Sequence, residues 1–337
     1  MGFSLVSTCR NEIAGVERWK ADMLVQTRPP DEIIIVDAES NDGTTQALNQ
    51  WVSEDRRVKV IRQRCSPAAG RNIAIRTASN EGIVSADFGV VYDRDWFREM
   101  CLPLEEREDV DAVAGHYTIN LASLRSAAAR ADFYLGERHK AHFGPPFLPS
   151  SRAIAYRREV WRRLDGYPED LTFSADDTVY ALQILRAGMN VAYAPKAICY
   201  WQRPRFLRDY WREAYNYGRG NGEANIYGLR LLRMFSGKIP FLIKLPVSVL
   251  KGALESVRPA LQALLNADFS ACLAIPLLAA GKTYSYYCGW GRGLEYGSVH
   301  CLSCRARLSL ASDAGIATAL SSTSATTDTL SGAFHDT

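Results

Sequence analysis

The sequence predicts an α/β fold in which a largely parallel sheet carries helices on both faces. The first 115 residues alternate between short apolar runs of strand length and longer stretches with helical spacing, which implies crossover connections between parallel strands. Several of the apolar runs end on a polar or acidic residue, and ligands of such sheets bind beyond the carboxyl ends of the strands. The chain has 337 residues and is 47% hydrophobic, enough for one large domain and an appendage.

Each expected element follows from its local pattern. The expected strands are, in chain order, residues 3–8, 32–37, 57–62, 82–87 and 111–117. The helices between them are expected at residues 15–26, 43–52 and 66–78 and near 93–100. Ser66 and Pro67 are typical of a helix N-cap and a first helical residue. Residues 150–200 predict a mixed segment of helix and strand, and after Trp201 the pattern becomes helical, basic and aromatic.

The charge of the chain is uneven. A net charge of +3 and a pI of about 8.4 are too mild to predict a nucleic-acid partner. Between Lys196 and Lys251, however, eleven Lys or Arg residues face only three acids, a local charge of +8 that leaves −5 for the rest of the chain. A basic block beside apolar segments indicates an anionic surface, either phosphates or a membrane leaflet.

Residues 229–304 form an apolar and basic helical region, which we expect to lie on a membrane surface. The longest uncharged apolar run covers residues 269–281, and these 13 residues are fewer than the roughly 18 that a spanning helix needs. Packing onto the N-terminal domain and dimerisation remain alternatives for this region. Residues 305–337 are rich in Ser, Thr and Ala, and a disordered tail is expected there.

The cysteines and the first residues bear on the compartment. Eight cysteines are scattered through a long chain, unlike a secreted disulfide scaffold. Cys301 and Cys304 form a Cys-x-x-Cys pair that lacks the second ligand pair of a zinc knuckle. No signal peptide is visible, because the first apolar run has strand length. The expected location is therefore cytoplasmic, peripheral on the inner face of the cell membrane.

Five motifs follow one another along the N-terminal two thirds of the chain. They read "STCRNE", "VDAESNDGT", "AAGRNIAI", "SADFGVVYDRDW" and "PSSRAIAYRREVWRRLDGYPEDLTFSADD". In this order and spacing the chain resembles the family 2 glycosyltransferases over roughly residues 3–225. The resemblance implies the GT-A fold, a Rossmann-like mixed sheet, with residues 1–228 as the catalytic domain. It also implies an inverting transferase that uses a nucleotide-diphosphate sugar.

The resemblance assigns donor-binding residues at the ends of the first two strands. Thr8, Arg10, Glu12 and Asp37 are implied to hold the nucleoside, and Arg71 to lie near the phosphates. Ala38 replaces a second acid that relatives often carry, which leaves the nucleobase open, although a UDP-sugar is favoured. For each single carboxylate the alternative is an ordinary one, since Asp and Glu at strand ends commonly form turns or helix caps.

A metal site is implied at the end of the fourth strand. Asp87-Phe88-Gly89 resembles an Asp-x-Gly variant of the family's Asp-x-Asp motif. Asp87 would then be the one side chain on Mg²⁺ or Mn²⁺, with both phosphates and waters completing the coordination, because such hard ions accept few protein ligands. The alternative is that Asp87 caps the following turn.

The last motif is implied to act on the acceptor. Asp177 matches the family's catalytic base, which takes a proton from the attacking hydroxyl. Asp176 beside it, together with Ser150, Ser151 and Arg152, is assigned to acceptor or sugar contact. The alternative for both acids is capping of the helix that they precede.

The acceptor is expected to be a glycan or a lipid-linked molecule in the synthesis of a cell-surface polysaccharide or glycoconjugate. The "QRPRF" stretch at residues 202–206 only approaches the Gln-x-x-Arg-Trp motif of processive synthases, so transfer of a single sugar is favoured over polymer extrusion. A protein of the same fold that binds nucleotide sugars or regulates without catalysis is the alternative function.

Overall fold

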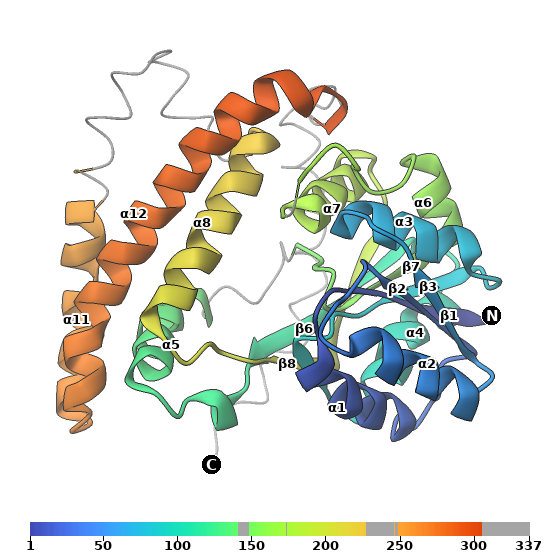
Figure 1. Cartoon of the computed structure of the whole chain (residues 1–337), viewed down its shortest axis with the longest axis horizontal. Coiled ribbons are helices and arrows are strands. Elements are labelled where there is room, and N and C mark those ends of the chain that lie inside the picture. The colour runs from blue at the N-terminus through green and yellow to red at the C-terminus, as the bar shows by residue number, and fades with distance from the viewer. Residues whose placement is uncertain (141–147, 173, 227–245, 247–248, 305–337) are drawn as a thin grey trace.

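A mixed eight-stranded sheet forms the centre of the N-terminal part of the molecule (Figure 1). The computed structural model describes residues 1–140, 148–172, 174–226, 246 and 249–304. In the described chain the strand order is β3-β2-β1-β4-β7-β6-β8-β5. The bounds are β1 (Phe3–Cys9), β2 (Glu32–Asp37), β3 (Val58–Arg62), β4 (Gly82–Ser85), β5 (Val90–Tyr92), β6 (Ala112–Ile119), β7 (Ile154–Arg157) and β8 (Val191–Trp201).

The sheet combines a parallel half with a mixed half. Strands β1 to β4 are mutually parallel where they pair, as the alternating pattern predicts. Beyond them β7 runs antiparallel to β4 and β6, β6 and β8 are parallel, and β5 is antiparallel to β8. The three-residue strand β5 was not expected, because a run this short carries no periodic signal.

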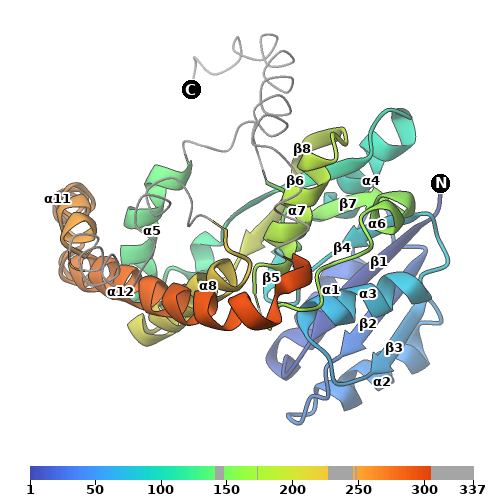
Figure 2. The ribbon, with the colours of Figure 1, turned by 90° about the horizontal axis from the view of Figure 1, so that it is seen from above.

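Helices cover both faces of the sheet, and Figure 2 shows the two layers from above. They are α1 (Ile13–Leu24), α2 (Thr44–Glu54), α3 (Pro67–Thr77), α4 (Trp96–Glu106), α6 (Arg158–Arg163) and α7 (Asp176–Arg186). Ile33 and Ile35 of β2 pack on one face with α1, α2 and α4, whereas Ile34 and Val36 pack on the other with α3 and α7. Because successive strand residues point to opposite faces, the unbroken apolar run of β2 is buried on both sides.

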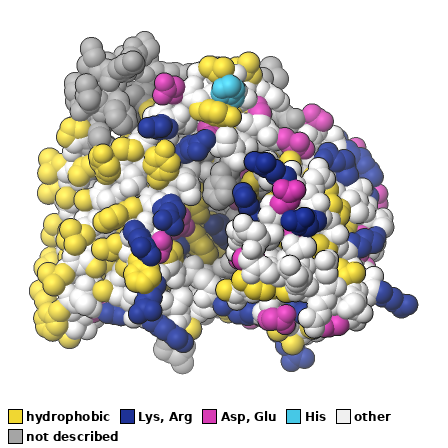
Figure 3. Space-filling model, in the orientation of Figure 1, with side chains coloured by type: hydrophobic (Ala, Val, Ile, Leu, Met, Phe, Trp, Pro, Cys, Tyr) yellow, Lys and Arg dark blue, Asp and Glu magenta, His cyan; other side chains and the backbone are white. Residues whose placement is uncertain are grey.

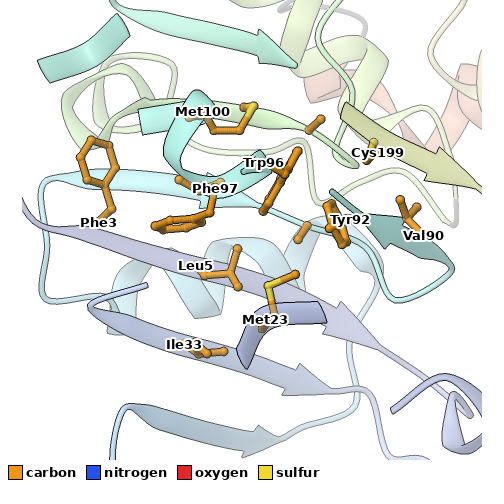
Figure 4. Close-up of a cluster of buried hydrophobic side chains, with 14 of the residues drawn as sticks. Phe3, Leu5, Met23, Ile33, Val90, Tyr92, Trp96, Phe97, Met100 and Cys199 are labelled. Carbon is orange, nitrogen blue, oxygen red and sulfur yellow. The ribbon is translucent and has the colours of Figure 1, made fainter. Parts of the chain in front are cut away.

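Aromatic side chains fill the larger of the two cores. Trp19 of α1 stacks on Phe88 with ring centroids 4.4 Å apart and meets Trp51 of α2 edge-on. Figure 4 shows Trp96 and Phe97 of α4 entering the same cluster as the strand residues Phe3, Leu5 and Ile33. This packing fixes the backbone around Phe88 and therefore the neighbouring Asp87.

A second group of helices lies beside the sheet (Figures 1 and 2). It comprises η1 (Leu121–Ser123), α5 (Ala127–Lys140), α8 (Leu207–Glu223), α11 (Val257–Leu265) and α12 (Phe269–His300). The apolar run expected at residues 269–281 is helical but continues to residue 300, giving 32 residues and a length of about 48 Å. None of the helices in the described ranges combines the length and apolar character needed to cross a membrane.

Glycines let α8 and α12 approach at backbone contact. A Cβ on Gly289 of α12 would lie 2.0 Å from the carbonyl oxygen of Tyr215, and one on Gly218 of α8 would lie 2.0 Å from that of Tyr286. Ala128 of α5, Tyr210 of α8, Ala263 of α11 and Ile275 of α12 share one apolar cluster. Helix α8 therefore packs with the C-terminal helices.

Part of the expected C-terminal region lies outside the described residues. This applies to the domain boundary at residue 228, to Arg230, Arg233, Lys238 and Lys244, and to the expected tail at 305–337. Cys301 and Cys304 are buried in a small apolar cluster with Leu171 and Val179, next to α7.

Candidate active site

Acidic side chains from two separate parts of the sequence meet at the carboxyl ends of the central strands. Asp87 follows β4, and its backbone N–H donates to the hydroxyl of Tyr92 over 2.8 Å. Asp176 begins α7. Arg71 of α3 lies between them, with Nη2 3.2 Å from Asp87 Oδ1 and Nη1 bonded to Asp176 Oδ2. The side chains of Arg71 and Asp176 are each 8% exposed and that of Asp87 is 28% exposed, so only Asp87 faces solvent appreciably.

The charges of this ion pair are set by burial and by the neighbours. Burial alone would lower the pKa of Arg71, but Asp176 and Asp87 outweigh it and keep the guanidinium protonated. Burial raises the pKa of Asp176 to about 6; the Arg71 charge opposes this rise, and the charges of Asp177 and Asp87 add to it. Arg71 is therefore a fixed positive charge directly behind Asp87.

Ser151 joins Asp87 to Asp177. Its hydroxyl lies 2.9 Å from Asp87 Oδ2 and 3.3 Å from Asp177 Oδ2, and its backbone N–H donates to Asp177 Oδ2 over 3.3 Å. The hydroxyl of Ser150 lies 3.2 Å from the same oxygen. The segment just before β7 thus brings together two carboxylates that are 90 residues apart in sequence.

Asp177 is held as a carboxylate. Its Oδ1 accepts the N–H of the next residue, Thr178, over 2.8 Å, and no side-chain hydrogen bond caps the start of α7. Burial raises the pKa of Asp177, but the guanidinium groups of Arg152 and Arg71 and the hydrogen bonds from Ser151 and Thr178 outweigh burial and hold the pKa below its usual range. Asp177 is therefore in the ionised form, which is the form that can accept a proton.

Arg152 contacts aromatic residues that the sequence motifs did not include. Its guanidinium donates to Ser150 Oγ over 3.0 Å and to the hydroxyl of Tyr217 in α8 over 3.1 Å. It also lies 4.3 Å from the ring centroid of Trp201, and Arg203 lies 4.0 Å from the same ring. Trp201 and Tyr217 were missed because both lie beyond the five motifs, in the aromatic and basic stretch after β8.

Asp37 takes part in the turn that follows β2. This side chain is fully buried: Oδ1 accepts from the N–H and hydroxyl of Ser40, and Oδ2 accepts from the hydroxyl of Thr45. Ser40 Oγ in turn accepts the N–H of Asn11, which ties the loop after β1 to the loop after β2. Asp37 therefore shapes the turn, as the ordinary alternative predicts, and presents no exposed oxygen.

The other residues that the resemblance assigns to the nucleoside lie at or just after the end of β1. Thr8 is half-buried at the end of β1, where a Cβ on Gly70 of α3 would lie 2.5 Å from its Cγ2, so the glycine permits the close approach. Arg10 is exposed. Burial raises the pKa of Glu12, and the charges of Asp87 and Asp42 raise it further. Glu12 thus borders the same electronegative region as Asp87.

Helix α8 supports the loop that leads into Asp176. A Cβ on Gly220 would lie 2.3 Å from Ser174 Oγ, and that hydroxyl donates to the carbonyl of Asn216 over 2.6 Å. The fully buried Glu223 accepts from the N–H and hydroxyl of Thr172 over 2.9 and 2.7 Å. Ala175 then turns the chain into α7 with φ of 71°. The packing of α8 therefore helps to position both acids at the start of α7.

In outline, the structure brings together the expected residues Arg71, Asp87, Ser150, Ser151, Arg152, Asp176 and Asp177. Thr8, Arg10 and Glu12 lie around the strand ends on the donor side, and Asp37 lies beneath its turn. Among the described residues, no group of three or more His, Cys, Asp or Glu side chains is placed to hold a metal ion by itself.

Two family models of glycosyltransferases match this chain. Residues 4–164 match the glycosyl transferase family 2, and residues 90–284 match the glycosyl transferase family group 2. The two matches together include every residue of the site described above. The second match alone covers more than half of the chain.

Individual relatives are distant. The O-antigen chain rhamnosyltransferase of Salmonella anatum is 25% identical over 208 residues, covering 58% of this chain and 64% of that protein. A Bacillus subtilis protein named as a probable glycosyltransferase is 27% identical over 206 residues, covering 56% of this chain and 47% of that protein. The chain thus matches less than two thirds of the length of these curated relatives.

A solved structure shares the fold. The mannosyltransferase of Pyrobaculum calidifontis, in complex with GDP-Man and Mn²⁺, aligns with a TM-score of 0.52 at 20% identity. The alignment covers 90% of this chain and 86% of that one. This likeness confirms the GT-A fold predicted from the sequence, with its mixed sheet and C-terminal helices.

Proposed function

Because the chain belongs to the family 2 glycosyltransferases, we propose that it transfers one sugar from a nucleotide-diphosphate sugar to a hydroxyl of a glycan or lipid-linked acceptor, with inversion at the anomeric carbon. A UDP-sugar is the favoured donor. The observation that carries the proposal is Ser151, whose hydroxyl lies within hydrogen-bond distance of both Asp87 and Asp177. The residue assigned to the diphosphate and the residue assigned to the acceptor therefore border one site.

Asp177 is the proposed general base. The acceptor oxygen attacks the anomeric carbon from the face opposite the diphosphate, and its proton passes to Asp177. The bond between the anomeric carbon and the diphosphate oxygen breaks, and its electron pair leaves with the diphosphate. The guanidinium groups of Arg152 and Arg71 keep Asp177 ionised and so ready to accept the proton. Ser150 and Ser151 hold its Oδ2 in place.

Asp87 fits a divalent metal ion that takes most of its ligands from the substrate. Its two oxygens each accept one hydrogen bond, from Arg71 and Ser151, which leaves other lone pairs available on a partly exposed carboxylate. Mg²⁺ or Mn²⁺ accepts few protein ligands and retains waters and phosphate oxygens, so a single carboxylate is sufficient. Bound there, the ion would neutralise charge on the departing diphosphate. Arg71 supplies a fixed positive charge beside it.

The donor nucleoside is proposed to bind over the loops that follow β1 and β2. Thr8, Arg10 and Glu12 supply polar and charged groups at this edge. Asp37 acts through the turn that it holds with Ser40 and Thr45. The preference for uracil rests on the sequence motifs alone.

The biological setting is proposed to be the synthesis of a surface polysaccharide or glycoconjugate at the inner face of the cell membrane. One relative is named as an O-antigen chain rhamnosyltransferase. The local charge of +8 between Lys196 and Lys251 supports an anionic surface as a partner.

A panel of nucleotide sugars tests the proposal. Thermal unfolding of the full chain is measured with each donor, with and without Mn²⁺. A ligand at 100 times its dissociation constant adds about 2.7 kcal/mol to the unfolding free energy, a shift that is readily measured. Stabilisation by one class of donor, greater with Mn²⁺, is expected. Absence of stabilisation by every nucleotide sugar and free nucleotide would overturn it.

A further inference from the structure

The outer faces of α11 and α12 expose a row of large apolar side chains. The row starts in the helical residues just before α11 and continues along both helices. Its members are Leu250, Leu254, Val257, Leu261, Leu264, Leu265, Phe269, Leu273 and Leu277, and each is between 46% and 85% exposed. Apart from the adjacent pair Leu264 and Leu265, they are spaced by three or four residues, which places them on one side of each helical segment. Figure 3 shows apolar side chains gathered along the edge of the molecule formed by these helices.

This outer row is not needed for the packing of the helices. The inner face of α12 is filled by Ala271, Ala274, Ile275 and Leu278, which pack with α5 and Tyr210 of α8. The helices are thus apolar on two sides, with the bulkier residues outside. A monomeric protein rarely exposes a contiguous apolar patch of more than a few hundred Å² unless the patch binds something.

Exposed basic side chains occur in the helical segments that carry the row and at the start of α8, and an exposed acid, Glu255, lies within the same segments. At the start of α8, Phe206 is 49% exposed, and the guanidinium carbons of Arg205 and Arg208 lie 5.5 and 5.1 Å from its ring centroid. The side chains of Arg208 and Arg212 are 73% and 72% exposed, with Asp209 as their shared acidic neighbour. Lys251 and Arg258 are exposed beside the leucines.

We propose that the outer faces of α11, α12 and the helical residues just before α11, defined by the nine apolar residues above, dock on an anionic lipid bilayer. The leucines and Phe269 enter the interface, as the apolar face of an in-plane helix does. The bordering arginines and lysines meet lipid phosphates. The inference deepens the proposed function, since it places the enzyme where a lipid-linked acceptor resides, and it rests on that function only for the identity of the acceptor.

The bordering charges favour lipid over a second copy of the chain. In a two-fold dimer the same patch occupies both sides of the contact, so the basic border of one copy would lie against that of the other. Like charges in that position oppose association. An anionic leaflet neutralises the same groups.

Vesicle flotation of the full chain tests the surface. The vesicles contain either phosphatidylcholine alone or phosphatidylcholine with phosphatidylglycerol. The wild type is expected to float with the anionic vesicles and to bind less at high salt, which screens the phosphate contacts. The double variant Leu265→Glu, Leu273→Glu should bind the anionic vesicles at least roughly tenfold more weakly than the wild type. It places charge at the two most exposed apolar positions of the row. Leu24→Glu, which alters an exposed leucine of α1 outside the row, should bind as the wild type does.

Two results would overturn the inference. One is a wild-type chain that remains unbound with both kinds of vesicle. The other is a dimer in sedimentation velocity that the double variant separates while vesicle binding is absent. The readout is independent of catalysis: a chain that floats but binds no nucleotide sugar supports the docking surface and fails the proposed function, whereas a chain that transfers sugar but never floats does the reverse. Unchanged thermal stability of the variants establishes that they are folded.

Discussion

Replacing Gly289 by alanine tests how the C-terminal helices are joined. The new Cβ would lie 2.0 Å from the carbonyl oxygen of Tyr215, 2.9 Å from its carbonyl carbon and 3.0 Å from the backbone nitrogen of Arg219. These are backbone atoms, so no rotamer change can relieve the contact. Helices α8 and α12 must move apart, and their close packing is lost along its length.

The expected cost follows from two opposing effects. Overpacking a well-packed contact costs about 1–3 kcal/mol, and a clash with backbone belongs at the upper end. Alanine in place of glycine returns about 1 kcal/mol of helix propensity. Gly136→Ala in α5 is the matched control, because its Cβ would meet Ile119 Cδ1 at an ordinary 3.9 Å and the variant keeps the gain in propensity. The unfolding free energies of the two variants should therefore differ by about 2–3 kcal/mol.

Thermal unfolding and transfer activity measure the consequence. At roughly 2–4 °C per kcal/mol, the Tm of Gly289→Ala should lie several degrees below that of Gly136→Ala. Activity should fall as well, because α8 contacts the loop leading to Asp176 through Gly220 and Glu223. If the two variants have the same Tm and activity, the helices are not joined through these glycines and the reasoning is refuted.

Three further substitutions test the site itself. Asp87→Ala should abolish the effect of Mn²⁺ on nucleotide binding; binding that still depends on the metal in calorimetry would place the metal site elsewhere. Asp37→Ala removes a buried acceptor that holds a turn, so it should lower the unfolding free energy by about 1–3 kcal/mol. It should also weaken nucleotide binding with or without metal. An unchanged melting curve would contradict this role. Arg152→Gln removes a positive charge that favours the ionised form of Asp177, so the pKa of Asp177 should rise and the acid limb of the kcat/KM profile should move to higher pH. An acid limb that stays in place would show that Arg152 does not set this pKa.

The local sequence pattern was sufficient to predict the parallel half of the sheet, strands β1 to β4. The unbroken apolar run of residues 32–37 predicts a strand buried on both faces, and β2 has these bounds. Because parallel strands end at the same edge of a sheet, the sequence also predicts that residues after β1, β2 and β4 lie close together. The hydrogen bond from the N–H of Asn11 to Ser40 Oγ, which joins the loops after β1 and β2, is consistent with that expectation.

Other features depend on contacts that no local pattern contains. The burial of Asp37 results from Ser40 and Thr45, which compete with any ligand for its oxygens. The contact of α8 with α12 depends on glycines some 70 residues apart, and neither helix reveals its partner. Arg152 lies beside Trp201 because β8, which ends at Trp201, pairs with β6 in the sheet.

Asp177→Asn provides the most direct test of the central claim that this chain is an inverting glycosyltransferase with Asp177 as its base. The amide keeps the size of the side chain but cannot accept the proton of the acceptor hydroxyl. Using the donor identified by the nucleotide-sugar panel, single-turnover transfer by the variant should be slower by about 10²- to 10⁴-fold, while the dissociation constant of the donor changes only a few-fold. Transfer at a rate near that of the wild type, with the variant folded and the donor bound, would contradict the account.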